Sequence, residues 1–277
     1  MAGRIADAGP EIPGLRRLRY RAALLIGAAL SIPPTATLAG AWTQPKGKAQ
    51  VIAKAERMVA DDAFDPDGER LPLPVERRDQ SLGVFAEYGL TDRLTVQVKG
   101  DWQDGEDQFV DYQGRGPLEV ALIWQAWRDD RTAVSVQAGY SSAGDGRNAG
   151  YAAPGVGEDD WEVRTSVGRS FGGAKSGPFR FDRSFVEVQA AQRFRDGLPN
   201  EVRADATIGA HIGERWLILG QAYAGAVDDD GARWLSLETS VVRHLGPWSL
   251  QAGWRETAAG RETPLGRGLV LAIWRRF

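Results

Sequence analysis

The residues most able to do chemistry in this chain are charged side chains at every second position of short apolar runs. Alternate residues of an extended strand point to the same face, so these charges would share one face. That row can line a polar pore or form ion pairs that fill an interior, and the sequence leaves both readings open. Its acids are Glu56, Glu87, Asp101, Glu119, Glu162, Glu187, Asp205 and Glu238, and its bases are Lys54, Lys99, Arg164, Arg203 and Arg255. The central pore-lining candidates are Glu87, Lys99, Glu119, Arg164, Glu187, Arg203 and Glu238.

Other familiar chemistries find little support. The chain has no cysteine and two histidines, His211 and His244, which fall near short turns with their strand phase pointing inward, so we interpret them as polar rim residues. Residues 61–68 resemble part of a calcium loop, but the register that puts Gly68 at position six puts Ala63 first and Pro74 twelfth. We therefore expect an acidic loop and predict no catalytic residue, metal site or cofactor. The net charge of −3 also argues against a nucleic-acid partner.

The elements that must position the charged row are β-strands. Apolar and polar residues alternate in twelve runs separated by turn-forming residues. In the last run, Val270, Ala272 and Trp274 share one face, and Leu269, Leu271, Ile273 and Phe277 share the other. The runs lie near residues 49–59, 79–90, 94–102, 118–127, 132–141, 161–171, 183–194, 201–211, 216–226, 232–243, 248–256 and 269–277.

Loop lengths and aromatic positions indicate a barrel that spans a membrane. The links near 60–78, 103–117 and 141–160 are long and acidic, whereas those near 91–93, 128–131, 213–215 and 245–247 are short. Aromatic residues sit at the run ends, as in the belts at a lipid–water interface. An apolar face turned to lipid requires closure, because an open strand edge in hydrocarbon leaves backbone groups unpaired. We predict an all-β, closed antiparallel transmembrane β-barrel of about twelve strands, with 60–78 and 141–160 outside the cell and Asp92 and Gly213 in the periplasm.

The first 39 residues have the pattern of a secretory signal peptide. Four arginines between residues 16 and 21 precede a short apolar stretch, residues 22–32, and small residues follow. Cleavage is expected before Gly40 or before Trp42, which makes residues 1–39 a signal peptide and residues 40–277 the barrel. Pro45 and Gly47 suggest that residues 40–47 form a short periplasmic lead-in.

The final run, closed by Phe277, resembles the last strand of bacterial outer-membrane β-barrels, and this resemblance covers residues 40–277. The stretch 41–47 and the hairpin 87–91 are similar to small transporter-type barrels of the phenol-degradation-pathway family. The resemblance implies the bacterial outer membrane as location, its lipid as surroundings, and recognition of Phe277 by the barrel-assembly machinery. Outer-membrane phospholipases, which are also twelve-stranded, place a Ser–His pair on the lipid face, where His211 and His244 do not point.

The leading functional hypothesis is a pore or transporter for small solutes. The alternative is a non-conducting barrel that anchors or scaffolds a cell-surface assembly, and a lipid-modifying hydrolase is a distant third. Eight acids against five bases in the inward row predict a preference for cations. The residues do not indicate the substrate, the oligomeric state or a protein partner.

Overall fold

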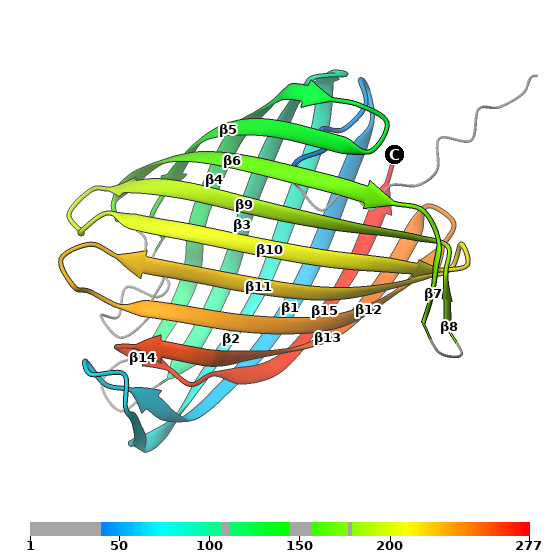
Figure 1. Cartoon of the computed structure of the whole chain (residues 1–277). Coiled ribbons are helices and arrows are strands. Elements are labelled where there is room, and N and C mark those ends of the chain that lie inside the picture. The colour runs from blue at the N-terminus through cyan, green and yellow to red at the C-terminus, as the bar shows by residue number, and fades with distance from the viewer. Residues whose placement is uncertain (1–39, 107–110, 145–156, 177–178) are drawn as a thin grey trace, which may run out of the picture. The chain divides into compact units, whose positions relative to one another are not determined.

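The computed structural model describes residues 40–106, 111–144, 157–176 and 179–277, and within them a closed barrel of twelve antiparallel strands. Each strand pairs with its neighbours in chain order, and β1 pairs with both β2 and β15, which closes the wall (Figure 1). The predicted fold class and strand number are therefore confirmed. The barrel strands are β1 (Ala49–Phe64), β2 (Arg70–Thr91), β3 (Leu94–Glu106), β4 (Asp111–Arg128), β5 (Thr132–Ser142), β6 (Asp159–Phe171), β9 (Arg183–Arg195), β10 (Glu201–Ile212), β11 (Trp216–Val227), β12 (Arg233–Leu245), β13 (Trp248–Arg261) and β15 (Arg267–Arg276).

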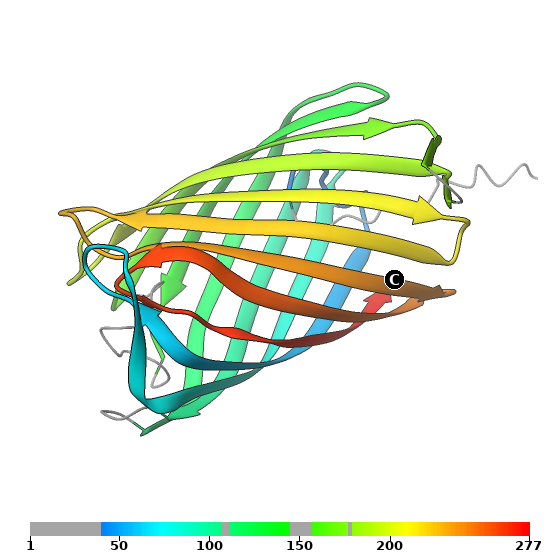
Figure 2. The same cartoon turned by 60° about the horizontal axis from the view of Figure 1, so that its bottom comes forward.

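Three short strands complete the set. The strands β7 (Ala174–Ser176) and β8 (Phe179–Phe181) pair as a hairpin between β6 and β9, and β14 (Thr263–Pro264) pairs with the far end of β1. The first barrel strand begins, and the last one ends, at the same end of the barrel, because Gln50 pairs with Arg276. We call this the terminal end and the opposite one the loop end. Figure 2 shows the C-terminus at the terminal end and the turn between β1 and β2 at the loop end.

The wall has an apolar outer face, which is what lipid requires. Outward residues such as Ile208, 61 % exposed, alternate with inward polar residues such as Thr207. Aromatic residues mark both borders of this face, for example Trp161 and Phe171 near the two ends of β6. Ten residues of strand span about 34 Å, or about 26 Å along the membrane normal at a tilt of about 40°, close to the apolar band of about 25 Å in such barrels. The described residues contain no helix long and apolar enough to cross a membrane.

Side-chain hydrogen bonds and glycines stabilise several short turns at the terminal end. Between β4 and β5, the Asp129 carboxylate accepts hydrogen bonds from the backbone N–H groups of Arg131 at 2.8 Å and Thr132 at 2.6 Å. These bonds favour the ionised carboxylate and lower the pKa of Asp129 below its usual value. Gly213 and Gly246 supply positive φ angles of 59° and 65° in two further turns.

The predicted long loop over residues 60–78 is wrong. β1 continues to Phe64 and β2 begins at Arg70, so residues 65–69 alone form the turn, where the Asp65 carboxylate accepts hydrogen bonds from the N–H groups of Asp67 and Glu69. Strand pairing continues here, and exposed charged residues such as Arg78 stand beside the exposed apolar residues Leu71 and Val75. The other predicted loops are shortened in the same way, since β3 ends at Glu106 and β6 begins at Asp159.

Some predictions fall on residues that the structure does not describe. The centres of the links 103–117 and 141–160, residues 107–110 and 145–156, lie outside the described ranges. So does the signal peptide of residues 1–39, whose removal stays a prediction.

The predicted periplasmic lead-in is also wrong. Residues 40–44, which we call the lumenal segment, are inside the barrel, and Gly40, Ala41, Thr43 and Gln44 are buried. Residues 45–48 reverse the chain between this segment and β1, with Gly47 at a φ of 74° and a hydrogen bond from the Lys48 N–H to the Pro45 carbonyl. The chain is therefore already inside the barrel before its first strand begins.

Candidate functional site in the barrel lumen

The largest group of lumenal charges surrounds Arg193 on β9, and we call it the Arg193 cluster. The guanidinium of Arg193, whose side chain is 3 % exposed, lies 3.1 Å from Glu119 and 3.0 Å from Glu162. Glu162 also pairs with Arg164 at 2.8 Å. The cluster spans β3, β4, β6, β9 and β10, and its other members are Lys99, Asp160, Glu201, Arg203 and Asp205. These side chains neutralise one another across five strands.

A second group of charges lies on β1, β12 and β13, around Arg255. Its guanidinium is 2.9 Å from Glu56 and 2.6 Å from Glu238, and Lys54 approaches Glu56 to 2.8 Å. The Arg255 side chain also lies over the ring of Tyr223, 4.9 Å from its centroid. Both groups show the ion-paired arrangement that the sequence left as one of two readings.

Two acids of the row have a different role. Within the described residues, Glu87 on β2 and Glu187 on β9 are buried without an ion-pair partner inside 4 Å. They accept hydrogen bonds from the lumenal segment instead. The Gln44 side-chain amide donates to Glu87 at 2.8 Å, and the Ala41 backbone N–H donates to Glu187 at 3.0 Å. The Gln189 amide is a second donor to Glu187, at 2.5 Å.

Further hydrogen bonds attach the lumenal segment to β3, β4 and β5. The Gln44 N–H donates to Thr95 Oγ1 at 2.9 Å, and the Gln125 amide donates to the Ala41 carbonyl at 2.6 Å. The Ser135 hydroxyl donates to the Gly40 carbonyl at 2.7 Å. The strands therefore satisfy the segment's own backbone groups, as a buried stretch without secondary structure requires.

Packing completes this attachment. The ring of Trp42 lies edge-on to Phe185, with centroids 6.2 Å apart. A side chain at Gly168 on β6 would overlap the Trp42 ring, and one at Gly89 on β2 would overlap the backbone of Gln44 and Pro45. Glycine at these two strand positions makes room for the segment.

Inward side chains differ in how completely they are buried. Inward apolar side chains on the wall opposite the segment, including Leu217, Leu219 and Trp274, are completely buried. By contrast, the Lys99 side chain is 52 % exposed although it points inward. Solvent therefore reaches Lys99, whereas it does not reach these apolar side chains near the terminal end.

The two histidines meet at the terminal rim. The rings of His211 and His244 stack with centroids 5.9 Å apart, and His244 Nδ1 lies 2.9 Å from the Ser249 hydroxyl. Both point into the lumen, as predicted, so this Ser–His pair does not face lipid. His211 Nδ1, His244 Nε2 and two guanidinium nitrogens of Arg276 are buried without a protein partner among the described residues, so they are available to water or an anion.

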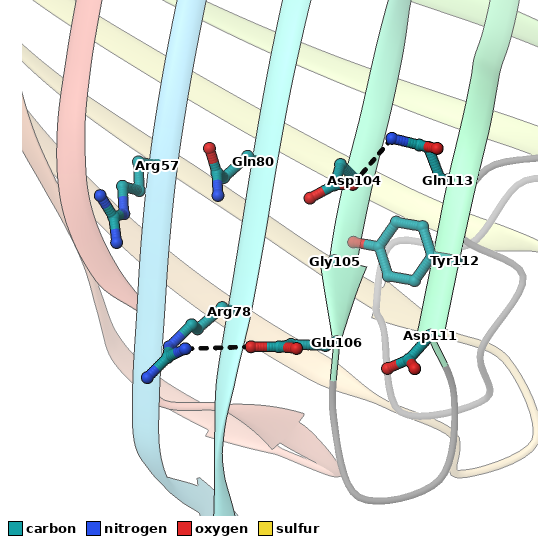
Figure 3. A pocket seen from close by; sticks show the side chains of 9 residues that line it. All are labelled: Arg57, Arg78, Gln80, Asp104, Gly105, Glu106, Asp111, Tyr112 and Gln113. Atoms are coloured by element: carbon teal, nitrogen blue, oxygen red, sulfur yellow. Dashed lines mark hydrogen bonds and ion pairs between the residues drawn. The ribbon is translucent and has the colours of Figure 1, made fainter.

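A separate pocket of about 420 Å³ lies at the loop end of β1–β4. Arg78 reaches Glu106 at 3.1 Å and Gln113 reaches Asp104 at 3.1 Å across neighbouring strands (Figure 3). Most of its lining shares the outward strand phase of Trp102, so the pocket is on the outer wall beyond the aromatic border. It is not part of the lumenal path.

Three carboxylates of the acidic hairpin at the loop end are engaged. Asp65 caps the turn, Asp62 pairs with Arg70, and Asp61 lies 2.9 Å from Arg267. The described residues contain no group of three or more His, Cys, Asp or Glu side chains that could hold a metal ion.

All seven central candidates from the sequence face the lumen, but the structure divides them. Lys99, Glu119, Arg164 and Arg203 belong to the Arg193 cluster, Glu238 pairs with Arg255, and Glu87 and Glu187 hold the lumenal segment. Their role in lining a conducting pore stays a prediction. The sequence interpretation missed Arg193, although it continues the period of Glu187 and Gln189.

Comparison with solved structures places this fold among outer-membrane barrels. The COG4313 outer membrane channel from Pseudomonas putida F1 is similar with a TM-score of 0.61 and 14 % identity, over 86 % of this chain and 98 % of that chain. The KdgM porin (TM-score 0.51, 6 % identity) aligns over 83 % of this chain and 99 % of that one, and the NanC porin (0.51, 8 %) over 80 % and 98 %.

These identities establish the fold alone. The chain has the fold of outer-membrane β-barrels, so the predicted resemblance to small barrels of this class is confirmed at that level. No protein-family model matches the sequence, and no curated protein matches it either.

Proposed function

We propose that this protein is an outer-membrane channel for small polar solutes, narrowed near its terminal end by the lumenal segment. The observation that carries the proposal is a closed wall with an apolar outer face and an inward face that holds charge, with Lys99 partly exposed inside it. An inward side chain that stays half exposed indicates that water reaches this part of the lumen. Similarity in fold to the COG4313 channel and to two porins supports the same reading.

The alternative is a non-conducting barrel that anchors or scaffolds a surface assembly. The completely buried inward side chains at the terminal end favour it, since a sealed lumen passes no ions. We do not propose a catalytic function. The Ser249 hydroxyl, which pairs with His244, is buried in the lumen and away from the lipid that a lipid-modifying hydrolase would need to reach.

Single-channel recording in planar bilayers separates the two readings. The refolded mature protein should give small conductance steps, and a chain that begins at Pro45 should give larger steps because it lacks the lumenal segment. If neither protein conducts, the channel proposal fails and the anchor becomes the better account.

Ion preference follows from the net charge of the inward row. The structure pairs most acids of the inward row with bases, so we expect the predicted cation preference to be weak. Replacing Glu119 and Glu187 by Gln should reduce it further, more so at low salt, where screening is weaker. Reversal potentials in a salt gradient measure the change, and an anion preference in the parent protein would contradict this part of the proposal.

We place the terminal end in the periplasm, because short turns face the periplasm in barrels of this class. The chain has no native cysteine, so single cysteines at Asp92 and Asp67 can report on the two ends. On intact cells a membrane-impermeant thiol reagent should label Asp67→Cys and leave Asp92→Cys unmodified. The opposite result would reverse the orientation.

A further inference from the structure

Gly40, the first described residue, lies directly against the carboxylate of Glu187. A side chain at Gly40 would overlap Oε1, Oε2 and Cδ of Glu187, so the Gly40 Cα is in contact with that group. Standard bond lengths then put the Gly40 nitrogen within about 5 Å of the nearer carboxylate oxygen. The same carboxylate already accepts the Ala41 N–H at 3.0 Å. A positive charge on the Gly40 nitrogen would therefore lie close to this carboxylate.

A positive charge at this position would stabilise the buried carboxylate of Glu187. Glu187 is 3 % exposed, and no lysine or arginine nitrogen of the described residues lies within 4 Å of it. Glu119, Glu162 and Glu238 each have such a nitrogen within 4 Å. A buried carboxylate without a counter-charge is costly, and its hydrogen bonds to Ala41 and Gln189 offset this cost in part.

The sequence offers a source of the missing charge. Cleavage after Thr37-Leu38-Ala39 would create a free α-amino group on Gly40, and such groups have a pKa near 7.7–8.0, so most are protonated at neutral pH. Cleavage after Ala41, the other site that the sequence allows, would remove Gly40 and Ala41. Those residues make the contacts to Glu187, Ser135 and Gln125.

We propose that the signal peptide is removed after Ala39 and that the resulting α-ammonium group of Gly40 is the ligand of Glu187 inside the barrel. Processing then completes the site, because an amide at Gly40 in the precursor carries no charge. Glu187 is a binding site for a primary ammonium, occupied by the chain's own N-terminus. This inference rests on signal cleavage and not on transport, so a barrel that fails to conduct would leave it intact.

The first measurement is the N-terminus itself. Mass spectrometry of protein extracted from the outer membrane should give a chain that begins at Gly40. A chain that begins at Trp42, or one that retains residues of the signal peptide, overturns the proposal.

The second measurement is the reactivity of the α-amino group. Folded protein is treated at pH 8 with an amine-reactive acetylating reagent, and modification is followed on the peptide of residues 40–46, in which Lys46 is the single other amine. The buried, ion-paired amine of the parent should react about tenfold more slowly than that of Glu187→Gln, since a charged hydrogen bond contributes about 1.5–3 kcal/mol.

The control is Glu238→Gln, which removes an equally buried lumenal acid on β12 that does not contact the segment. Its α-amino group should stay as protected as in the parent. If Glu187→Gln does not fold, Glu187→Asp takes its place. This variant keeps the charge but moves the carboxylate away from Gly40, so its α-amino group should react at an intermediate rate. A difference in SDS gel mobility between unheated and heated samples shows that each variant forms a folded barrel. Equal rates for the parent and the Glu187 variants would overturn the proposal.

Discussion

The Arg193 cluster and the lumenal segment use the same kind of residue in two different ways. Glu119 and Glu187 both point inward from a strand and are both glutamates, yet guanidinium and ammonium side chains neutralise Glu119, whereas main-chain and amide N–H groups bind Glu187. In the Arg193 cluster, ion-paired side chains fill the lumen. In the other region the lumenal segment, which has no regular secondary structure, fills it, and the acids bind this segment. Strand phase identifies which acids are inside but does not reveal which of these roles each one has.

The difference also separates the two regions in space. The lumenal segment contacts β2–β6 and β9 close to the terminal end, and the Arg193 cluster lies on overlapping strands nearer the loop end. Gln189 links them, because its amide donates to Glu187 while its carbonyl oxygen accepts a hydrogen bond from Arg164 at 2.7 Å. Movement of the lumenal segment would therefore affect the Arg193 cluster through the Gln189 side chain.

The largest effect is expected from breaking the Arg193 cluster at its centre. Arg193→Met leaves Glu119, Glu162 and Asp160 without their shared guanidinium, and removing one partner of a buried pair costs about 3–5 kcal/mol. The free energy of unfolding can be measured by urea titration in lipid with tryptophan fluorescence. Arg57→Met on the outer wall is the matched control and should change stability by less than about 0.5 kcal/mol. Equal losses would show that the cluster does not hold the wall together.

The inward and outward faces of the wall can be tested on β5. Val136 points outward and Gln137 inward in the middle of that strand. Val136→Arg should destabilise the barrel by about 2–4 kcal/mol near the bilayer midplane. Gln137→Arg should cost much less, because the lumen accepts charge. The same urea titration compares the two, and similar losses would contradict the assigned phase.

The strands and their phases could be predicted because they depend on local pattern. A residue that faces lipid must be apolar whatever its distant neighbours are, so Leu269, Leu271 and Ile273 indicate their orientation by themselves. The extensions of β1 and β2 beyond residues 60 and 78 escaped prediction for the same reason. Outside the lipid there is no such constraint, and strand pairing continues there with charged and apolar residues mixed on the exposed positions.

The candidate site was predictable only as a set of inward charges. Arg193 and Glu119 are 74 residues apart, and their pairing depends on which strands become neighbours and on strand stagger. The lumenal segment was harder to predict, since Ala41 and Glu187 are separated by 146 residues and residues 40–44 have no periodic pattern. A signal was nevertheless present. Gly89 and Gly168 interrupt regular strands, where glycine often marks the close approach of another segment.

A smaller effect is expected from the side chain that wedges the lumenal segment in place. Trp42 is half-buried against Phe185 and Gly168, so Trp42→Ala should cost about 1–3 kcal/mol, below the range for a fully buried tryptophan. The segment should also become mobile, and single-channel conductance should rise toward that of a chain beginning at Pro45. Trp127→Ala, on the outer wall, should leave conductance unchanged. An unchanged conductance in Trp42→Ala would mean that the segment does not narrow the lumen.

The smallest effect should come from one hydroxyl of the lumenal segment. Thr43 Oγ1 lies 3.0 Å from Gln125 Oε1 and 3.2 Å from the Asp92 carbonyl, and its proton can be donated to one of them at a time. Thr43→Val keeps the shape and removes that donor, which should cost about 1 kcal/mol because the Gln125 amide oxygen is buried. Thr239→Val, outward on β12, is the control and should be near neutral.

Since Gln125 also donates to the Ala41 carbonyl, the loss of the Thr43 hydroxyl leaves the segment attached at Ala41 and Gln44. Conductance should therefore stay close to the parent value although stability falls. A large rise in conductance would instead show that the segment is held at Thr43, and that its bonds to Glu87 and Glu187 contribute little.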